Sequence, residues 1–152
     1  MALPPHIDLR IVYPDRLVVH ETVDEVQIPG TLGYFGVLPG HTPMLAALTA
    51  GELWYRKGQE KTFVAILFGF AEVRPDAVTI LAKLAERAEE IDVERAEAAR
   101  RRAQERLSQP ASGVDHDRAR VALMKSLVRL QVSSRVGLGA RVGAMKRLSH
   151  QG

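Results

Sequence analysis

The stretch Ala85-Glu86-Arg87-Ala88-Glu89-Glu90-Ile91-Asp92-Val93-Glu94-Arg95-Ala96 separates two patterns of apolar residues. Before it, apolar residues recur about every second position, as in a β-strand, and after it about every 3.6 positions, as in an α-helix. Asp92 can accept a hydrogen bond from the first turn of a helix, and it places negative charge at the positive end of that helix. The stretch therefore predicts a junction between a strand-rich half and a helical half.

Short segments with strand-like alternation fill the first half of the chain. They are residues 7–13, 16–20, 23–28, 52–56, 62–67, 71–73 and 77–82, and the glycine-rich segment 30–45 surrounds one more short apolar strand. Turn-forming glycine and proline residues separate them, a spacing typical of β-sandwiches and barrels. Gly69 lies where a strand must bend or approach a neighbour closely.

Two amphipathic helices are predicted after the junction. The first, 92–108, carries an apolar stripe of Ala96, Ala99, Ala103 and Leu107, and the second, which Asp115 or Asp117 can cap, carries Ala119, Ala122, Leu123, Leu127 and Leu130 and ends near residue 133. The short loop between them predicts an antiparallel hairpin, with pairs from Arg101 to Glu97 and Glu105 along the first helix. Alanine stripes bury little area, so at about 25 cal/mol per Å² the hairpin gains only a few kcal/mol and can open.

Composition limits the class of protein. The 152 residues are 46% apolar and 26% charged, which is close to globular averages and argues against wholesale disorder. The chain has no cysteine, which excludes disulfides and thiolate ligands. Its apolar runs are shorter than the roughly 20 residues of a membrane-spanning helix, and its first residues do not resemble a signal peptide. We therefore expect a protein that is soluble or held at a membrane only through partners.

The sequence contains no set of residues typical of a catalytic site. No nucleophile, base and orienting group can be assigned among five isolated histidines, so no catalytic residue is predicted. His41 has no second ligand at metal-binding spacing, which favours a hydrogen-bonded turn residue and predicts no metal site. The glycine-rich segment lacks the Lys-Ser or Lys-Thr pair of a phosphate loop. Trp54 and Tyr55 are a single aromatic pair without a surrounding basic stripe, so no nucleic-acid partner is expected.

Several motifs together resemble the epsilon subunit of bacterial F-type ATP synthases. They are VLPGHTP (37–43) preceded by Gly33 and Gly36, GFAEVRPD (69–76), and TILA (79–82) leading into AERA (85–88). The resemblance covers residues from about Ile7 to Leu130. It implies an N-terminal flattened β-sandwich of about ten strands (1–87) and a C-terminal antiparallel two-helix hairpin (88–133), followed here by a basic flexible tail (134–152).

The resemblance also implies a function without chemistry of its own. Such a subunit is part of the central stalk (rotor), links the gamma subunit to the c-ring, and inhibits ATP hydrolysis when its mobile hairpin reaches the alpha and beta catalytic subunits. It is peripheral, at the cytoplasmic face of the bacterial plasma membrane. Tyr34 stands at the c-ring contact, where many relatives have an acidic residue, and His41 belongs to the same glycine-rich segment. Arg118 and Lys125 can meet acidic partner surface, although their charge alone favours a solvated helix face.

In several bacterial members, the motif that Ile91-Asp92-Val93-Glu94-Arg95-Ala96 matches belongs to an ATP site. By this resemblance the nucleotide-binding candidates are Glu86, Ile91, Asp92, Arg95, Arg102 and Arg129, while Lys125 replaces an arginine. Guanidinium groups hold phosphates in two-point contacts, which lysine cannot do. ATP would then be regulatory rather than a required cofactor. The alternatives are that Asp92 is only a helix cap, or that the chain is a free-standing nucleotide-binding sensor or interaction module.

Overall fold

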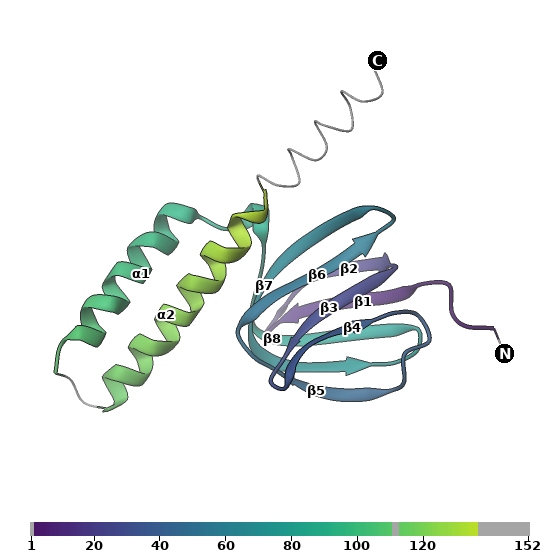
Figure 1. Ribbon diagram of the computed structural model, residues 1–152, viewed down its shortest axis with the longest axis horizontal. Coiled ribbons are helices and arrows are strands. Elements are labelled where there is room, and N and C mark those ends of the chain that lie inside the picture. The colour runs from purple at the N-terminus through teal and green to yellow at the C-terminus, as the bar shows by residue number, and fades with distance from the viewer. Residues whose placement is uncertain (1, 111–112, 137–152) are drawn as a thin grey trace, which may run out of the picture.

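The computed structural model describes residues 2–110 and 113–136 of the chain. Its elements are β1 (Ile7–Tyr13), β2 (Arg16–Val23), β3 (Glu25–Gly30), β4 (Gly33–Val37), β5 (Met44–Leu48), β6 (Gly51–Lys57), β7 (Glu60–Val73), β8 (Ala77–Arg87), the 3₁₀ turn η1 (Ala88–Glu90), α1 (Val93–Ser108) and α2 (Gly113–Ser133). Figure 1 shows the strands gathered in one body, with the helical hairpin beside them and α2 on the side that faces the strands. Residues 137–152 of the predicted tail lie outside the described residues.

The strands pair in the order β2-β1-β8-β7-β5-β3-β4, and β6 pairs with both β3 and β7. All of these pairs are antiparallel except β1 with β8. The predicted fold class, a β-sandwich followed by a helical hairpin, is confirmed, with eight strands where the resemblance implied about ten. One reason is that β7 is a single strand of 14 residues across the region where two short strands, 62–67 and 71–73, were predicted.

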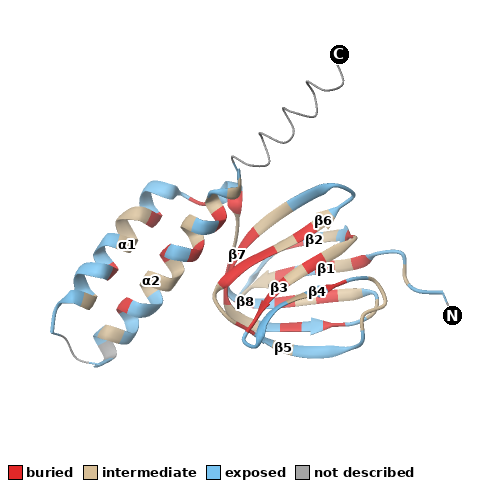
Figure 2. Cartoon of the chain, in the orientation of Figure 1, coloured by how far each residue is buried: buried red, intermediate tan, exposed pale blue. Residues whose placement is uncertain are grey.

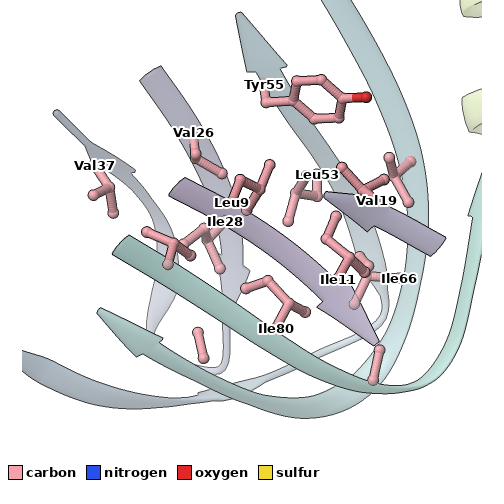
Figure 3. Packing of buried hydrophobic residues seen from close by; sticks show 14 of the residues in the cluster. Leu9, Ile11, Val19, Val26, Ile28, Val37, Leu53, Tyr55, Ile66 and Ile80 are labelled. Carbon is pink, nitrogen blue, oxygen red and sulfur yellow. The ribbon is translucent and has the colours of Figure 1, made fainter. Parts of the chain in front are cut away.

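The core lies between the strands and follows from their alternation. Successive side chains in a strand point to opposite faces, so Ile7, Leu9 and Ile11 of β1 are all fully buried. Figure 3 shows Leu9 and Ile11 packed among side chains from other strands, including Leu53 and Ile66. This core makes the sandwich a rigid base for whatever is attached to its outer faces.

Gly69 allows β7 to change its partner midway. Residues before the bend pair with β6, and residues from Gly69 onward pair with β5. Phe68 and Gly69 both have positive φ angles, of 50° and 129°. A Cβ atom on Gly69 would lie 1.9 Å from the carbonyl oxygen of Leu81 in β8. Only glycine fits both the backbone angle and the space, which confirms the bend and close approach expected from the sequence.

The junction stretch differs from its prediction in where the strand ends and in how it connects to the helix. The strand β8 continues to Arg87, five residues past its predicted end, and η1 connects it to the helix. Asp92 is the N-cap of α1, as predicted, and its Oδ1 accepts a hydrogen bond from the Arg95 backbone N–H at 3.1 Å. The predicted cap of α2 is wrong, because the helix already begins at Gly113, which places Asp115 inside its first turn and Asp117 beyond that turn.

The two helices meet through small side chains, as the alanine stripe predicted. Ala96, Ala103 and Ala119 are buried, and Figure 2 shows buried positions on both helices of the hairpin. Leu127 was expected in the stripe but is 47% exposed, while Val128 and Val132 are buried instead. The expected pairs to Arg101 are also wrong, since Arg100 pairs with Glu97. The buried stripe of α2 differs because the last turns of α2 face the sandwich rather than α1.

Replacing Gly69 by alanine tests the bend in β7. The clash with the Leu81 carbonyl and the positive φ angle are expected to lower the free energy of unfolding by about 2–4 kcal/mol. Chemical denaturation followed by circular dichroism measures this change. The matched control is Gly36→Ala in β4, where a Cβ atom meets nothing within 4 Å. The control is expected to change stability by less than about 0.5 kcal/mol, and equal losses in both variants would contradict the prediction.

Candidate functional site

A small apolar cluster attaches the hairpin to the sandwich. Val128 and Val132 of α2 pack with Ala65 of β7 and with Ala88 and Ile91 at the junction. Ala65 is fully buried although it lies on the outer side of β7. The cluster places the last turns of α2 across the sheet and brings side chains of α2 close to the end of β8.

Arg129 makes the main polar contact at this attachment. Its Nε donates to Glu86 Oε2 at 2.9 Å, and its Nη2 donates to Glu86 Oε1. Both side chains are about one quarter exposed. A two-point arginine–carboxylate pair is stronger and more directional than a single contact. It therefore determines how the hairpin base lies against β8.

An acidic cavity of about 200 Å³ adjoins this pair. It is lined by Glu86, Glu90, Asp92, Arg95, Ala96 and Arg129. Among the described residues, the guanidinium of Arg95 has no ion-pair partner. Three carboxylates against two guanidinium groups supply more acceptors than donors, an environment suited to amino groups and hydroxyls.

A more open, basic cleft of about 450 Å³ lies between the helices. Its lining consists of Ala99, Asp117, Arg118, Val121, Ala122, Lys125 and Arg129. Three cationic side chains and one carboxylate make it suited to an anion, with the wide opening of a surface groove. Arg129 lines both hollows, so the two are neighbours, and their charged groups change from mainly acidic in the cavity to mainly basic in the cleft.

The structure brings together part of the candidate set. Glu86, Asp92, Arg95 and Arg129 line the acidic cavity, and the two residues predicted to bind partners through α2, Arg118 and Lys125, join Arg129 in the basic cleft. Ile91 is 9% exposed and belongs to the apolar cluster, and Arg102 is exposed on α1 and lines neither hollow.

Tyr34 and His41 lie elsewhere, on the sandwich. The Tyr34 hydroxyl accepts a hydrogen bond from the Glu52 backbone N–H at 3.2 Å, and its side chain is half exposed. His41 is a hydrogen-bonded turn residue, as predicted: its Nδ1 donates to the Thr42 carbonyl at 2.6 Å. Within residues 2–110 and 113–136, no three acidic or histidine side chains are grouped to hold a metal.

Sequence reasoning missed a row of apolar side chains on the outer face of the sandwich. Directly paired residues on five strands, β5, β7, β8, β1 and β2, form it: Ala47, Phe70, Leu81, Val12 and Leu17. Phe70 is 63% exposed, Leu81 is 55% exposed and Leu17 is 53% exposed. Leu45, on the same face of β5, is also exposed. Contiguous exposed apolar side chains of this kind mark interaction surfaces.

The signal for this row was present in the sequence. Residues 63–70 and 78–82 are almost continuously apolar, whereas a strand with one face in water alternates. A run without alternation indicates a strand covered on both faces. The sequence predicts strands within these runs, which are too short to span a membrane, but the predicted strands alone do not reveal an exposed apolar face.

The fold and the site define a docking protein, with a sandwich that offers an apolar face and a hairpin that carries a cleft with basic side chains. Residues 6–88 match the family model for the β-sandwich domain of the ATP synthase delta/epsilon chain, and residues 89–134 match the model for its long α-helix domain. The chain belongs to the ATP synthase delta/epsilon chain family. This membership confirms the expected non-catalytic stalk subunit of an F-type ATP synthase.

Individual relatives agree with the family models over most of the chain. The ATP synthase epsilon chain of Syntrophobacter fumaroxidans is 51% identical over 129 residues, which are 85% of this chain and 96% of that protein. The epsilon chain of Nitratidesulfovibrio vulgaris is 49% identical over 126 residues, 83% of this chain and 94% of that protein. A chain of the Euglena gracilis mitochondrial ATP synthase is 27% identical with a TM-score of 0.74, and the match covers 91% of this chain and 84% of that chain.

The described part of the chain has no helix that is long and apolar enough to cross a membrane.

Proposed function

We propose that the chain is the rotor subunit that joins the gamma subunit to the c-ring of an F-type ATP synthase, and that it docks on gamma through the apolar row. The observation that carries this proposal is the set of exposed, cross-strand paired side chains around Phe70 and Leu81. A row across five strands spans roughly 20 Å at about 4.8 Å per strand. That width suits an extended protein interface with an apolar centre.

The sandwich provides a second contact at its glycine-rich segment, which faces the c-ring in this proposal. Leu32, at the turn between β3 and β4, is fully exposed, and Tyr34 beside it is half exposed. With these contacts the chain is held at the cytoplasmic face of the bacterial plasma membrane through its partners. Its contribution is mechanical coupling, while the alpha and beta subunits carry out the chemistry.

Phe70→Ser and Leu81→Ser test the docking face. Because both side chains are exposed, the isolated chain is expected to keep its stability within about 0.5 kcal/mol. Binding to purified gamma subunit is expected to weaken about 30-fold or more for each variant, as for the centre of an interface. Surface plasmon resonance measures the affinity.

The control for this test is Leu38→Ser, which removes a leucine that is as exposed as Leu81 but lies outside the row. It is expected to bind gamma normally. If Phe70→Ser and Leu81→Ser also bind normally, the row is not the gamma contact. If the wild-type chain does not bind gamma at all, the rotor proposal fails and a free-standing nucleotide sensor becomes the better interpretation.

The hairpin is the regulatory part of the proposal. Its helices meet mainly through Ala96, Ala103 and Ala119, which bury little area, and its attachment to the sandwich rests on a small apolar cluster and two ion pairs. Because this attachment is worth only a few kcal/mol, the hairpin can leave it for a contact of similar strength with a partner. Extended, the hairpin would present Arg118 and Lys125 to acidic surface on the catalytic subunits and inhibit ATP hydrolysis.

Removing the chain from Glu90 onward tests this regulation. The truncated sandwich is expected to assemble with gamma, and the ATPase rate of the assembled enzyme is expected to rise several-fold because the inhibitory element is absent. Steady-state ATP hydrolysis with and without the truncation measures the effect. An unchanged rate in an enzyme shown to contain the truncated chain would contradict an inhibitory hairpin.

ATP is the proposed ligand of the two neighbouring hollows. The acidic cavity offers Asp92 and Glu86 to the adenine amino group and the ribose hydroxyls, and the basic cleft offers Lys125 and Arg118 to the phosphates. Arg129 lies between them and would have to share its guanidinium between Glu86 and a phosphate. Bound ATP would touch both helices and the end of β8, and would therefore stabilise the docked hairpin.

Calorimetric titration of the isolated chain with ATP tests this ligand. Arg129→Ala and Arg95→Ala are expected to weaken binding about 10- to 100-fold, because each removes a charged hydrogen-bond donor. Asp92→Ser separates two roles of that residue, since serine keeps the helix cap but not the carboxylate. Arg106→Ala, on an exposed part of α1 outside both hollows, is the control. Absence of binding at millimolar ATP would exclude the nucleotide proposal.

A further inference from the structure

We infer that Glu52 and Arg135 form a latch that holds the hairpin on the sandwich without nucleotide. Arg135 lies two residues beyond the end of α2, and its Nε donates to Glu52 Oε2 at 3.0 Å. Its guanidinium also lies over the ring of Phe63 in β7, 5.4 Å from the ring centre. The contact therefore joins the end of the hairpin to two strands of the sandwich.

The burial of Glu52 is the first argument for a latch. Its side chain is only 8% exposed, although it lies on the outer side of the sheet, where α2 covers it. A carboxylate is rarely buried without a partner, because burial removes its hydration. Docking of α2 therefore imposes a desolvation cost on Glu52, and Arg135 supplies the charge that offsets it.

The register of the sheet is the second argument. Glu52 of β6, Ala65 of β7 and Glu86 of β8 are direct cross-strand neighbours. Val128 and Val132 of α2 pack on the central Ala65. Arg129 of α2 pairs with Glu86 on one side, and Arg135, just beyond the end of α2, pairs with Glu52 on the other. The acid–alanine–acid row, defined as Glu52, Ala65 and Glu86, thus receives α2 through one apolar and two charged contacts.

The two charged contacts have different relations to the nucleotide site. Arg129 lines both hollows proposed to bind ATP, whereas Arg135 and Glu52 line neither. A ligand that recruits Arg129 leaves the Arg135 contact intact. The Glu52 backbone is itself fixed, because its N–H donates to the Tyr34 hydroxyl. The latch therefore acts on the docked state independently of ATP. This inference rests on the proposed role of the hairpin as a movable element.

The latch makes a specific prediction for single and double variants. Arg135→Gln leaves the Glu52 carboxylate to be buried without a cation, so the ratio of docked to undocked hairpin is expected to fall about tenfold or more. Glu52→Gln/Arg135→Gln removes both charges, so docking is expected to recover to within about threefold of the wild-type ratio. If each side chain acted only through its own contacts, the losses of docking caused by the two substitutions would instead add up in the double variant.

Pulsed electron paramagnetic resonance on the full-length chain measures docking directly. The natural sequence has no cysteine, so spin labels at Glu60→Cys on the sandwich and Gln104→Cys on α1 report one distance. Without nucleotide, the wild-type background is expected to give one dominant docked distance. Arg135→Gln is expected to add a second, broader population, and the double variant is expected to lose it again.

Arg106→Gln is the matched control, because it removes an exposed arginine of the hairpin outside the attachment. Far-UV circular dichroism checks that every variant keeps its strands and helices. A single docked distance in Arg135→Gln, or a double variant as undocked as Arg135→Gln, overturns the latch. If the distances shift as expected but ATP hydrolysis by the assembled enzyme does not change, the latch stands and the inhibitory role of the hairpin fails.

Discussion

Val128 and Val132 of α2 pack against Ala65 at the centre of the acid–alanine–acid row, and the charged contacts on either side depend on that packing. Only with α2 in this position does Arg129 reach Glu86 and Arg135 reach Glu52. The small side chain of Ala65 lets the helix come close to the sheet, and the carboxylates beside it admit only partners that bring positive charge. The apolar contact at Ala65 and the charged contacts beside it therefore select the same position of α2.

This attachment has the properties of a contact that can be exchanged. Its apolar part is small, and each ion pair is offset by the cost of removing charges from water, so the net stabilisation is much smaller than the number of contacts suggests. The candidate nucleotide site lies at the same attachment, because Arg129 belongs to both hollows. A ligand there would therefore bias the hairpin through residues that already hold it.

The sandwich, in contrast, has a closed apolar core. Its core is closed by fully buried side chains such as Leu9, Ile11 and Ile80, and Gly69 allows β7 to serve two neighbouring strands. The same strands expose Phe70 and Leu81 on their other face. A sheet with apolar side chains on both faces buries the outer ones only when a partner covers that face. The strands that form the core therefore also form the surface for assembly.

The sequence by itself determined the two-part architecture, the cap at Asp92, the bend at Gly69 and the alanine contact between the helices, because these depend on neighbouring residues and local backbone geometry. It also placed Asp92, Arg95 and Arg129 among the candidates for one site. The tertiary structure decided which of them meet. It buried Ile91, left Arg102 and Leu127 exposed, and paired Glu52 with Arg135 across 83 positions of sequence. Such pairings depend on the angle at which α2 crosses the sheet, and no periodicity within one element encodes that angle.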